Sequence, residues 1–392
     1  MFTRLLRANH GGCRPYLSLR YKSQGLDASK LVFTKTTTPK QKLPNDELVF
    51  GKTFTDHMLE VEWTQADGWG VPKISPYHKL SLDPSTVVFH YAFELFEGMK
   101  AYRDNNNNIR TFRADKNMER MNKSAERICL PTFDGEELMK LIDKLLLADA
   151  DFVPQGAGYS LYLRPTMIGT TESLGVATPD KALIFVIASP VGPYYSSGFK
   201  PVSLEATDYA VRAWPGGVGN RKLGANYAPC ILPQLDAAKR GYHQNLWLFG
   251  EEGYITEVGT MNAFFVFKDS KTGIKELVTA PLDGTILEGV TRDSILELCR
   301  ERLSKDQWVV NERKFTISEV KERAEKGELV EAFGAGTAAV VSPIKTIGWN
   351  GQDIDVPIVA GNSGELTAQV AEWIRKIQYG EEEYKDWSRV AK

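Results

Sequence analysis

Hydrophobic residues along the chain follow two patterns, one typical of strands and one typical of helices. Short runs rich in β-branched and aromatic residues predict strands at residues 86–93, 108–113, 159–167, 181–188, 202–206, 245–250, 263–268 and 276–280. Apolar residues at helical spacing predict helices at residues 117–130, 135–150, 292–303, 317–326 and 364–377. Strands and helices occur in both halves of the chain, which predicts an α+β fold.

A stretch rich in glycine, proline and serine, SPVGPYYSSGFKPV, interrupts these patterns at residues 189–202. Such a composition is typical of a connection between domains. We expect a smaller N-terminal α+β domain at residues 28–191, a linker at 192–202 and a larger C-terminal α+β domain at 203–392. Small ligands favour the clefts between domains, so the sequence predicts an active site in an interdomain cleft.

The first 24 residues differ in charge from the rest of the chain. They contain no acidic residue, and their basic residues are Arg4, Arg7, Arg14, Arg20 and Lys22. An arginine-rich leader that contains serine and lacks acids is typical of a mitochondrial transit peptide. We expect residues 1–24 to be such a cleavable peptide and the protein to lie in the mitochondrial matrix. A disordered basic tail is the alternative.

Composition and charge narrow the class of function. Hydrophobic residues make up 42% and charged residues 25% of the 392 residues, as in ordinary globular proteins, and the formal net charge is −2. This charge provides no basic field for a nucleic-acid backbone, and no apolar run reaches the length of a membrane span. The cysteines and histidines are scattered, so neither a metal site nor a disulfide framework is indicated. We expect small-molecule partners, without metal, nucleic acid or membrane.

A glycine-rich loop, GGVGNRKLGANYAP at residues 216–229, surrounds a single lysine, Lys222. The loop lacks the spacing of a phosphate-binding P-loop and of a dinucleotide-binding GxGxxG turn. Apolar segments flank it, which favours burial of Lys222. Burial disfavours the charged form of an amine, and an uncharged amine forms Schiff bases with aldehydes, including pyridoxal phosphate. A solvent-exposed loop lysine is the alternative.

Pyridoxal phosphate needs an acid beside its ring nitrogen and hydrogen-bond donors around its phosphate. Glu257 lies where a predicted strand ends, just before Gly259, a position from which a carboxylate can point into a cleft. Residues 289–291 open a predicted helix, and residues 334–337 form a turn of small residues. Helix N-termini and such turns present free N–H groups to anions. Taken singly, these features also fit a solvated glutamate and an ordinary helix cap.

Taken together and in their order, these segments resemble the branched-chain amino acid aminotransferases, which are pyridoxal phosphate enzymes of fold type IV. The resemblance runs from about residue 48 to the C-terminus, and the eukaryotic mitochondrial members look most similar. The segments that carry it include HYAFELFEGMKAYR (90–103), LYLRPTMIGT (161–170), VRAWPGG (211–217), KLGANY (222–227), ITEVGTMN (255–262), APLDGTILEGVTR (280–292) and FGAGTA (333–338). The resemblance implies a homodimer that exchanges amino groups between L-leucine, L-isoleucine or L-valine and 2-oxoglutarate by a ping-pong cycle.

The resemblance also implies roles for individual residues. Lys222 matches the lysine that links to the cofactor and carries the proton, Glu257 the partner of the ring nitrogen, and Tyr227 the tyrosine at the ring oxygen. The remaining cofactor contacts, most of them at the phosphate, match Arg120, Arg212, Val290, Thr291, Gly336 and Thr337. The substrate contacts match Tyr91, Phe96, Tyr162, Arg164, Val176, Tyr194, Thr260 and Ala338, with Val176 reaching in from the partner subunit.

Two alternatives remain open on the sequence. D-amino acid transaminases and aminodeoxychorismate lyases share the lysine and the glutamate, but are expected to lack the segments at 90–98 and 192–195 in this form. A non-enzymatic protein could instead use the loop at 216–229 to bind a phosphorylated ligand. The joint presence of Lys222, Glu257 and Tyr227 argues against a binding protein.

Overall fold

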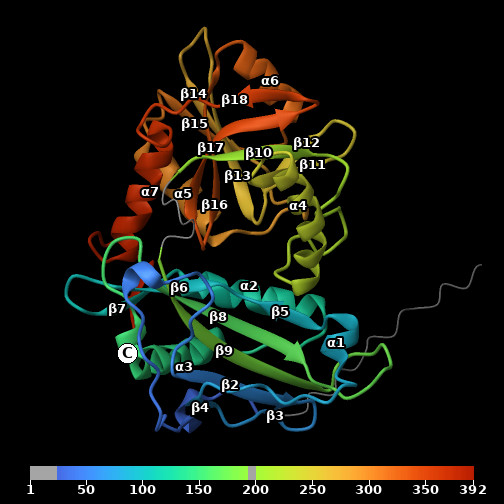
Figure 1. Ribbon diagram of the computed structural model, residues 1–392, viewed down its shortest axis with the longest axis vertical. Helices are drawn as coiled ribbons and strands as arrows, with labels where there is room; N and C mark the ends of the chain where they lie inside the picture. Colours follow the sequence, from blue (N-terminus) through green and yellow to red (C-terminus); the bar gives the residue numbers. More distant parts are fainter. Residues whose placement is uncertain (1–23, 193–199) are drawn as a thin grey trace, which may run out of the picture.

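The computed structural model describes residues 24–192 and 200–392. The predicted transit peptide, except for its last residue, and residues 193–199 of the predicted linker lie outside the described residues. Two β-sheets, each with its own helices, form two lobes. The first sheet lies in the first lobe, at the bottom of Figure 1, and the second sheet lies in the second lobe, at the top. The α+β fold class is therefore confirmed.

The first sheet has the strand order β1-β4-β2-β9-β8-β6-β7-β19, with β3 paired to β2 and β5 paired to β8. Its strands are β1 (Val32–Phe33), β2 (His57–Thr64), β3 (Gly68–Trp69), β4 (Lys73–Pro76), β5 (Glu94–Phe96), β6 (Met99–Arg103), β7 (Ile109–Phe112), β8 (Ser160–Gly169), β9 (Lys181–Val191) and β19 (Ser388–Val390). Helices α2 (Ala114–Arg127) and α3 (Gly135–Ala148) pack their apolar faces on it and form one core with β2, β6, β8 and β9.

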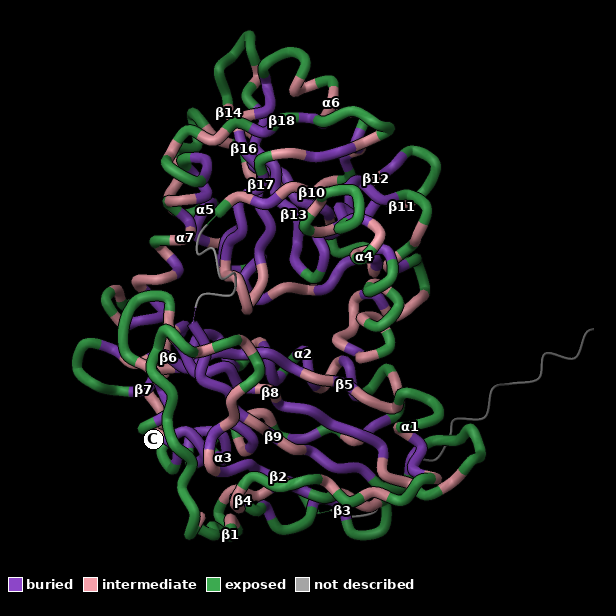
Figure 2. Tube along the Cα trace, viewed as in Figure 1, coloured by how far each residue is buried: buried purple, intermediate pink, exposed green. Residues whose placement is uncertain are grey.

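The second sheet has the order β12-β11-β10-β17-β16-β13-β14-β15, with β18 on β17. Its strands are β10 (Val202–Thr207), β11 (Gln244–Phe249), β12 (Tyr254–Val258), β13 (Met261–Lys268), β14 (Lys275–Thr279), β15 (Trp308–Glu312), β16 (Leu329–Gly336), β17 (Val340–Trp349) and β18 (Gln352–Asp355). Helices α4 (Ile231–Lys239), α5 (Val290–Arg302), α6 (Ile317–Glu325) and α7 (Glu365–Gln378) surround it. Buried residues concentrate along the strands of both sheets (Figure 2).

Local sequence explains where several helices begin. Asp134 precedes α3 and accepts hydrogen bonds from the N–H groups of Glu136 and Glu137, and Thr316 caps α6 in the same way. Gly289 precedes α5 without any side-chain cap. The first N–H groups of α5 therefore have no partner from a capping side chain, which matters because α5 begins at the cavity described below.

One sequence prediction about secondary structure is wrong. Residues 86–93 were expected to form a strand, but they contain the short helix α1 (Val87–Tyr91). Only Val87 is buried in this helix, and Ala92 ends it with a φ of 52°. A β-branched and aromatic run favours a strand only where neighbouring strands cover it, and here residues 89–92 are exposed.

The other predicted strands and helices overlap observed elements of the same type. The chain end was expected to belong with the C-terminal half, yet β19 pairs antiparallel with β7 in the first sheet. In residues 24–192 and 200–392, no helix combines the length and the apolar character that crossing a membrane requires.

Candidate active site

A cavity of about 280 Å³ lies between the two sheets. Its walls come from both lobes: β5, α2 and β8 on one side, and β12, the start of α5 and the end of β16 on the other. The predicted site residues that line it are Phe96, Arg120, Tyr162, Arg164, Lys222, Tyr227, Glu257, Thr260, Val290, Thr291, Gly336, Thr337 and Ala338. Its volume is close to that of sites for small molecules.

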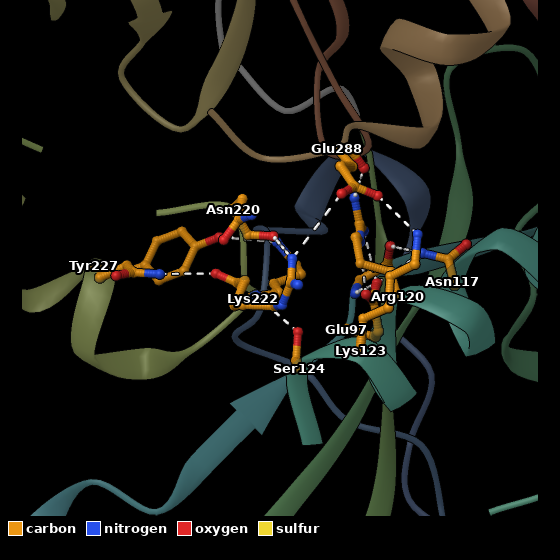
Figure 3. Close-up of polar contacts among 12 residues, drawn as sticks. Glu97, Asn117, Arg120, Lys123, Ser124, Asn220, Lys222, Tyr227 and Glu288 are labelled. Carbon is orange, nitrogen blue, oxygen red and sulfur yellow. Dashed lines mark hydrogen bonds and ion pairs between the residues drawn. The ribbon is translucent and has the colours of Figure 1, made fainter. Parts of the chain in front are cut away.

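Lys222 reaches the cavity from a loop that is tied to the first lobe. The Lys222 carbonyl accepts a hydrogen bond from the Phe96 N–H at 3.1 Å, and its own N–H donates to Oγ of Ser124 at 2.9 Å. The Lys222 ammonium nitrogen Nζ lies 3.0 Å from the Tyr227 hydroxyl (Figure 3). Among the described residues, no carboxylate forms an ion pair with this amine. Backbone contacts therefore fix an amine that remains available in the cavity wall.

The two carboxylate oxygens of Glu257 have different partners. Oε1 accepts hydrogen bonds from the Leu287 N–H at 3.0 Å and the Asn262 amide at 3.1 Å. Oε2 forms a buried ion pair with Nε of Arg212 at 2.6 Å, in which the N–H of Nε does not point directly at the oxygen. Burial raises the pKa of Glu257, and Arg212 opposes that rise. Oε2 can therefore accept a hydrogen bond from a cationic N–H group in the cavity.

Arg120 is held by a buried carboxylate that the sequence analysis missed, that of Glu97. Nε and Nη2 of Arg120 each lie 2.8 Å from an oxygen of Glu97, and the Asn117 amide donates to the same carboxylate at 2.7 Å (Figure 3). Burial raises the pKa of Glu97, but the Arg120 guanidinium outweighs it and holds that pKa below its ordinary value. The bidentate pair fixes the orientation of Arg120 at the cavity wall.

The start of α5 forms a site for an anion on the second lobe. Among the described residues, the N–H groups of Val290 and Thr291 have no hydrogen-bond acceptor. A Cβ atom at Gly289 would lie 2.0 Å from Oδ1 of Asn262, so only glycine fits between the helix start and that amide. Free N–H groups at a helix N-terminus, with threonine hydroxyls beside them, are suited to a phosphate group.

Aromatic rings form the wall opposite this anion site. The rings of Phe50 and Tyr162 meet edge to face with centroids 4.8 Å apart. The Arg164 guanidinium lies 4.7 Å from the ring centroid of Phe96, and its Nη2 donates to the Tyr162 hydroxyl at 3.1 Å. The wall thus offers apolar faces to an aliphatic group, with one cation at its edge. Phe50 was not predicted, because an isolated phenylalanine carries no sequence signal for a site.

Three predicted site residues that the structure describes do not line the cavity. Arg212 lies behind it and pairs with Glu257. Tyr91 and Val176 are exposed on the first lobe, where the Tyr91 hydroxyl donates to the carbonyl of Leu174 at 2.5 Å. Tyr194 lies outside the described residues. For these four residues, the roles that the resemblance implies stay predictions.

The chain matches the family described as amino-transferase class IV over residues 94–347. It is 69% identical over 366 residues to the cytosolic branched-chain-amino-acid aminotransferase of Saccharomyces cerevisiae, covering 93% of this chain and 97% of that protein. It is 68% identical over 366 residues to the mitochondrial enzyme of the same yeast, covering 93% of each.

Solved structures share the fold. A branched-chain aminotransferase from Thermoproteus uzoniensis with norvaline superposes with a TM-score of 0.67 at 25% identity, covering 85% of this chain and 99% of that one. The branched-chain amino acid aminotransferase of Escherichia coli gives a TM-score of 0.68 at 23% identity, with coverage of 85% and 99%. The expected two-lobed fold is confirmed by these structures.

Proposed function

The chain belongs to the branched-chain-amino-acid aminotransferases of the class IV family, and from this premise we propose that it transfers amino groups reversibly between L-leucine, L-isoleucine or L-valine and 2-oxoglutarate. Pyridoxal phosphate is the proposed cofactor. The observation that supports this function most strongly is the cavity that brings together the Lys222 amine, the buried Glu257 carboxylate and the free N–H groups of α5.

These residues fit pyridoxal phosphate by the chemistry of their donors and acceptors. The cofactor, when bound, supplies an aldehyde for an amine and a cationic ring that withdraws electrons from the substrate α-carbon. Lys222 would hold the aldehyde carbon, and Glu257 would accept the N–H of the ring. Arg120, with the N–H and hydroxyl groups of Thr291 and Thr337, would hold the phosphate.

We propose that Lys222 also transfers a proton at the substrate α-carbon. It is the lysine that lines the cavity, and its hydrogen bond to the Tyr227 hydroxyl keeps the amine beside the aromatic wall. An amine at this position can take a proton as a base and return it as an acid. Tyr227 therefore acts as the partner that orients Lys222.

The aromatic wall suits the proposed pair of substrates. Phe96 and Tyr162 offer apolar faces to a branched aliphatic side chain. Glutamate and 2-oxoglutarate carry a second carboxylate, which the Arg164 guanidinium and the Tyr162 hydroxyl can bind without burying an unpaired charge. Thr260 and the turn at residues 337–338 would receive the α-carboxylate that both substrate classes share.

A substrate panel tests the proposal. With 2-oxoglutarate as acceptor, we expect kcat/KM for L-leucine, L-isoleucine and L-valine to exceed that for L-alanine and L-aspartate by at least about 10-fold. Each additional methylene that is buried against the aromatic wall stabilises the transition state further. Faster turnover of D-leucine than of L-leucine would replace the proposal with a D-amino acid transaminase. A colourless protein that binds a phosphorylated ligand without turnover would replace it with a binding protein.

We propose that two copies of the chain associate through an exposed apolar surface. On the first lobe it comprises Phe89, Tyr91, Leu174 and Val176, and on the second lobe Tyr209, Val211, Trp214, Ile231, Leu232 and Leu235. Figure 1 places α1 and α4, which carry part of these two sets, on the same side of the molecule. An apolar surface of this kind is typical of a subunit interface.

The expected result is a dimer in sedimentation equilibrium. Leu232→Asp should shift it toward monomer and lower activity, because it places a charge in the apolar surface. The matched control is Leu147→Asp, which changes an exposed leucine of α3 and should leave the dimer intact. A wild-type protein that sediments as a monomer at micromolar concentration would rule out this association.

We propose that the protein is mitochondrial. The two yeast relatives named above include one cytosolic and one mitochondrial enzyme, so the support for this location is the acid-free basic leader. Residues 1–30 fused to a fluorescent protein should direct it to mitochondria, and the full chain without residues 1–24 should remain outside them. Mitochondrial fluorescence from the truncated chain would contradict the role of the leader.

A further inference from the structure

Lys100 is a buried lysine of the first lobe that the proposed chemistry does not use. It lies on β6 opposite Tyr162 of β8, and it is 8% exposed. Its ammonium nitrogen donates a hydrogen bond of 2.6 Å to the carbonyl oxygen of Ala338, in the turn between β16 and β17. A single side chain therefore connects the first sheet to the turn that lines the active-site cavity from the second sheet.

The charge of Lys100 has no compensating carboxylate within the part of the chain that the structure describes. The Lys100 side chain lines a second cavity of about 340 Å³ on the other side of the turn. The titratable and charged groups that share this cavity are Tyr102, Lys200, Arg375 and Tyr379, and none of them carries negative charge near neutral pH. Burial lowers the pKa of Lys100 to about 8. Burying an ammonium group without a compensating charge costs free energy. The presence of Lys100 at this position therefore points to a bound anion that balances its charge.

The turn that Lys100 contacts lines the active-site cavity and contains N–H groups without a hydrogen-bond acceptor. Ala338 and Ala339 line both cavities, and among the described residues their N–H groups have no hydrogen-bond acceptor. In a planar trans peptide, the C=O group and the following N–H group point in opposite directions. The bond from Lys100 to the Ala338 carbonyl therefore turns the Ala339 N–H away from Lys100.

A strained residue, the first residue of β17, directly follows this turn. Val340 has a φ of 62°, in a region that β-branched residues avoid. Such a conformation persists only where surrounding contacts hold it. The hydrogen bond from Lys100 is one contact of this kind, because it holds the turn two residues before Val340.

We propose that Lys100 is a positioning residue for the substrate α-carboxylate. Its ammonium holds the Ala338 carbonyl so that the N–H groups of the turn at residues 337–339 face the active-site cavity, and its positive charge balances the carboxylate that binds to them. This inference rests on the proposed function, because that function places an α-carboxylate at the turn. It adds to that function the group that supplies the compensating charge.

Two probes that differ only in charge test this role in the holoenzyme. 4-Methylpentanoate carries a carboxylate and a leucine-like side chain, and 4-methylpentanamide is its neutral counterpart. Calorimetric titration should show that the wild-type enzyme binds the carboxylate at least about 10-fold more tightly than the amide. Lys100→Met should abolish this preference and raise KM for L-leucine and 2-oxoglutarate more than it lowers kcat, while the cofactor content stays unchanged.

The matched control is Lys268→Met, which changes an exposed lysine at the end of β13 and should retain the preference. If Lys100→Met weakens both probes equally and leaves the preference intact, Lys100 only joins the lobes and the inference is overturned. A wild-type enzyme that binds both probes but transaminates no branched-chain amino acid would overturn the proposed function instead.

The wild-type enzyme provides a second test that needs no variant at Lys100. Because the folded-state pKa of Lys100 is about 8, its charge is present below that pH and is lost above it. The preference for the carboxylate over the amide should therefore fall as the pH rises from 7 to 9.5. A preference that stays constant across this range would overturn the inference even if Lys100→Met does not fold.

Discussion

Replacing Lys222 by alanine should abolish transamination, with kcat/KM for L-leucine reduced by at least about 10⁴-fold. Lys222 is the lysine that lines the cavity between the lobes, and a second lysine nearby, the buried Lys100, donates to Ala338 on the far side of the turn. The variant would lose both the covalent attachment of the cofactor and the group that moves the α-proton. The measurement is the steady-state rate with L-leucine and 2-oxoglutarate.

The structure suggests why this loss should be chemical rather than structural. The backbone of Lys222 is fixed by bonds to Ser124 and Phe96, and neither bond involves the side chain that alanine removes. Circular dichroism and the denaturation midpoint of Lys222→Ala should therefore match the wild type. Lys268→Ala, at an exposed site, serves as the matched control and should keep full activity. Near-normal turnover by Lys222→Ala would refute the assignment.

Replacing Glu257 by glutamine should lower kcat by roughly 10²-fold or more, the scale expected when a preorganised charge is lost in a water-excluded site. Glutamine retains the shape of the side chain and can still accept the bond from the Leu287 N–H. It removes the negative charge that would stabilise a cationic ring, and it leaves Arg212 without its ion-pair partner. The variant should still bind the cofactor, measured by its visible absorbance.

A second buried glutamate provides the control for this substitution. Glu331 accepts hydrogen bonds from the N–H groups of Leu366 and Thr367 at the start of α7, away from the active-site cavity. Glu331→Gln should therefore lower the free energy of unfolding with little effect on kcat. If both variants lose stability and neither loses kcat, the ring nitrogen has another partner and the role assigned to Glu257 is wrong.

The sequence predicts those parts of the site that local chemistry determines. Lys222 and Glu257 each stand two residues before a glycine, in segments whose apolar flanks favour burial, so each can be found from its own neighbourhood. Glu97 cannot be found in this way, because its importance comes from Arg120 and Asn117, which reach it from another element. Phe50 is missed for the same reason: its contact with Tyr162 joins residues far apart in the chain.

The fold shows the same division between local and long-range information. The predicted strands that became strands have neighbouring strands on both sides, whereas half of the residues in the run at 86–93 are exposed and the run contains a short helix instead. The pairing of β19 with β7 joins the last residues of the chain to the first sheet. Hydrophobic patterning does not specify such a pairing, because it fixes which face of a strand is buried and not which strand lies beside it.

The most direct test of the central claim follows the amino group itself. ¹⁵N-labelled L-leucine is added to the purified holoenzyme without an acceptor, and 2-oxoglutarate is added after the excess leucine has been removed. The proposed ping-pong exchange predicts up to one equivalent of 4-methyl-2-oxopentanoate per active site in the first step and a matching amount of ¹⁵N-glutamate in the second, with neither product from Lys222→Ala. Absence of the 2-oxo acid in the first step, or unlabelled glutamate in the second, would contradict the account.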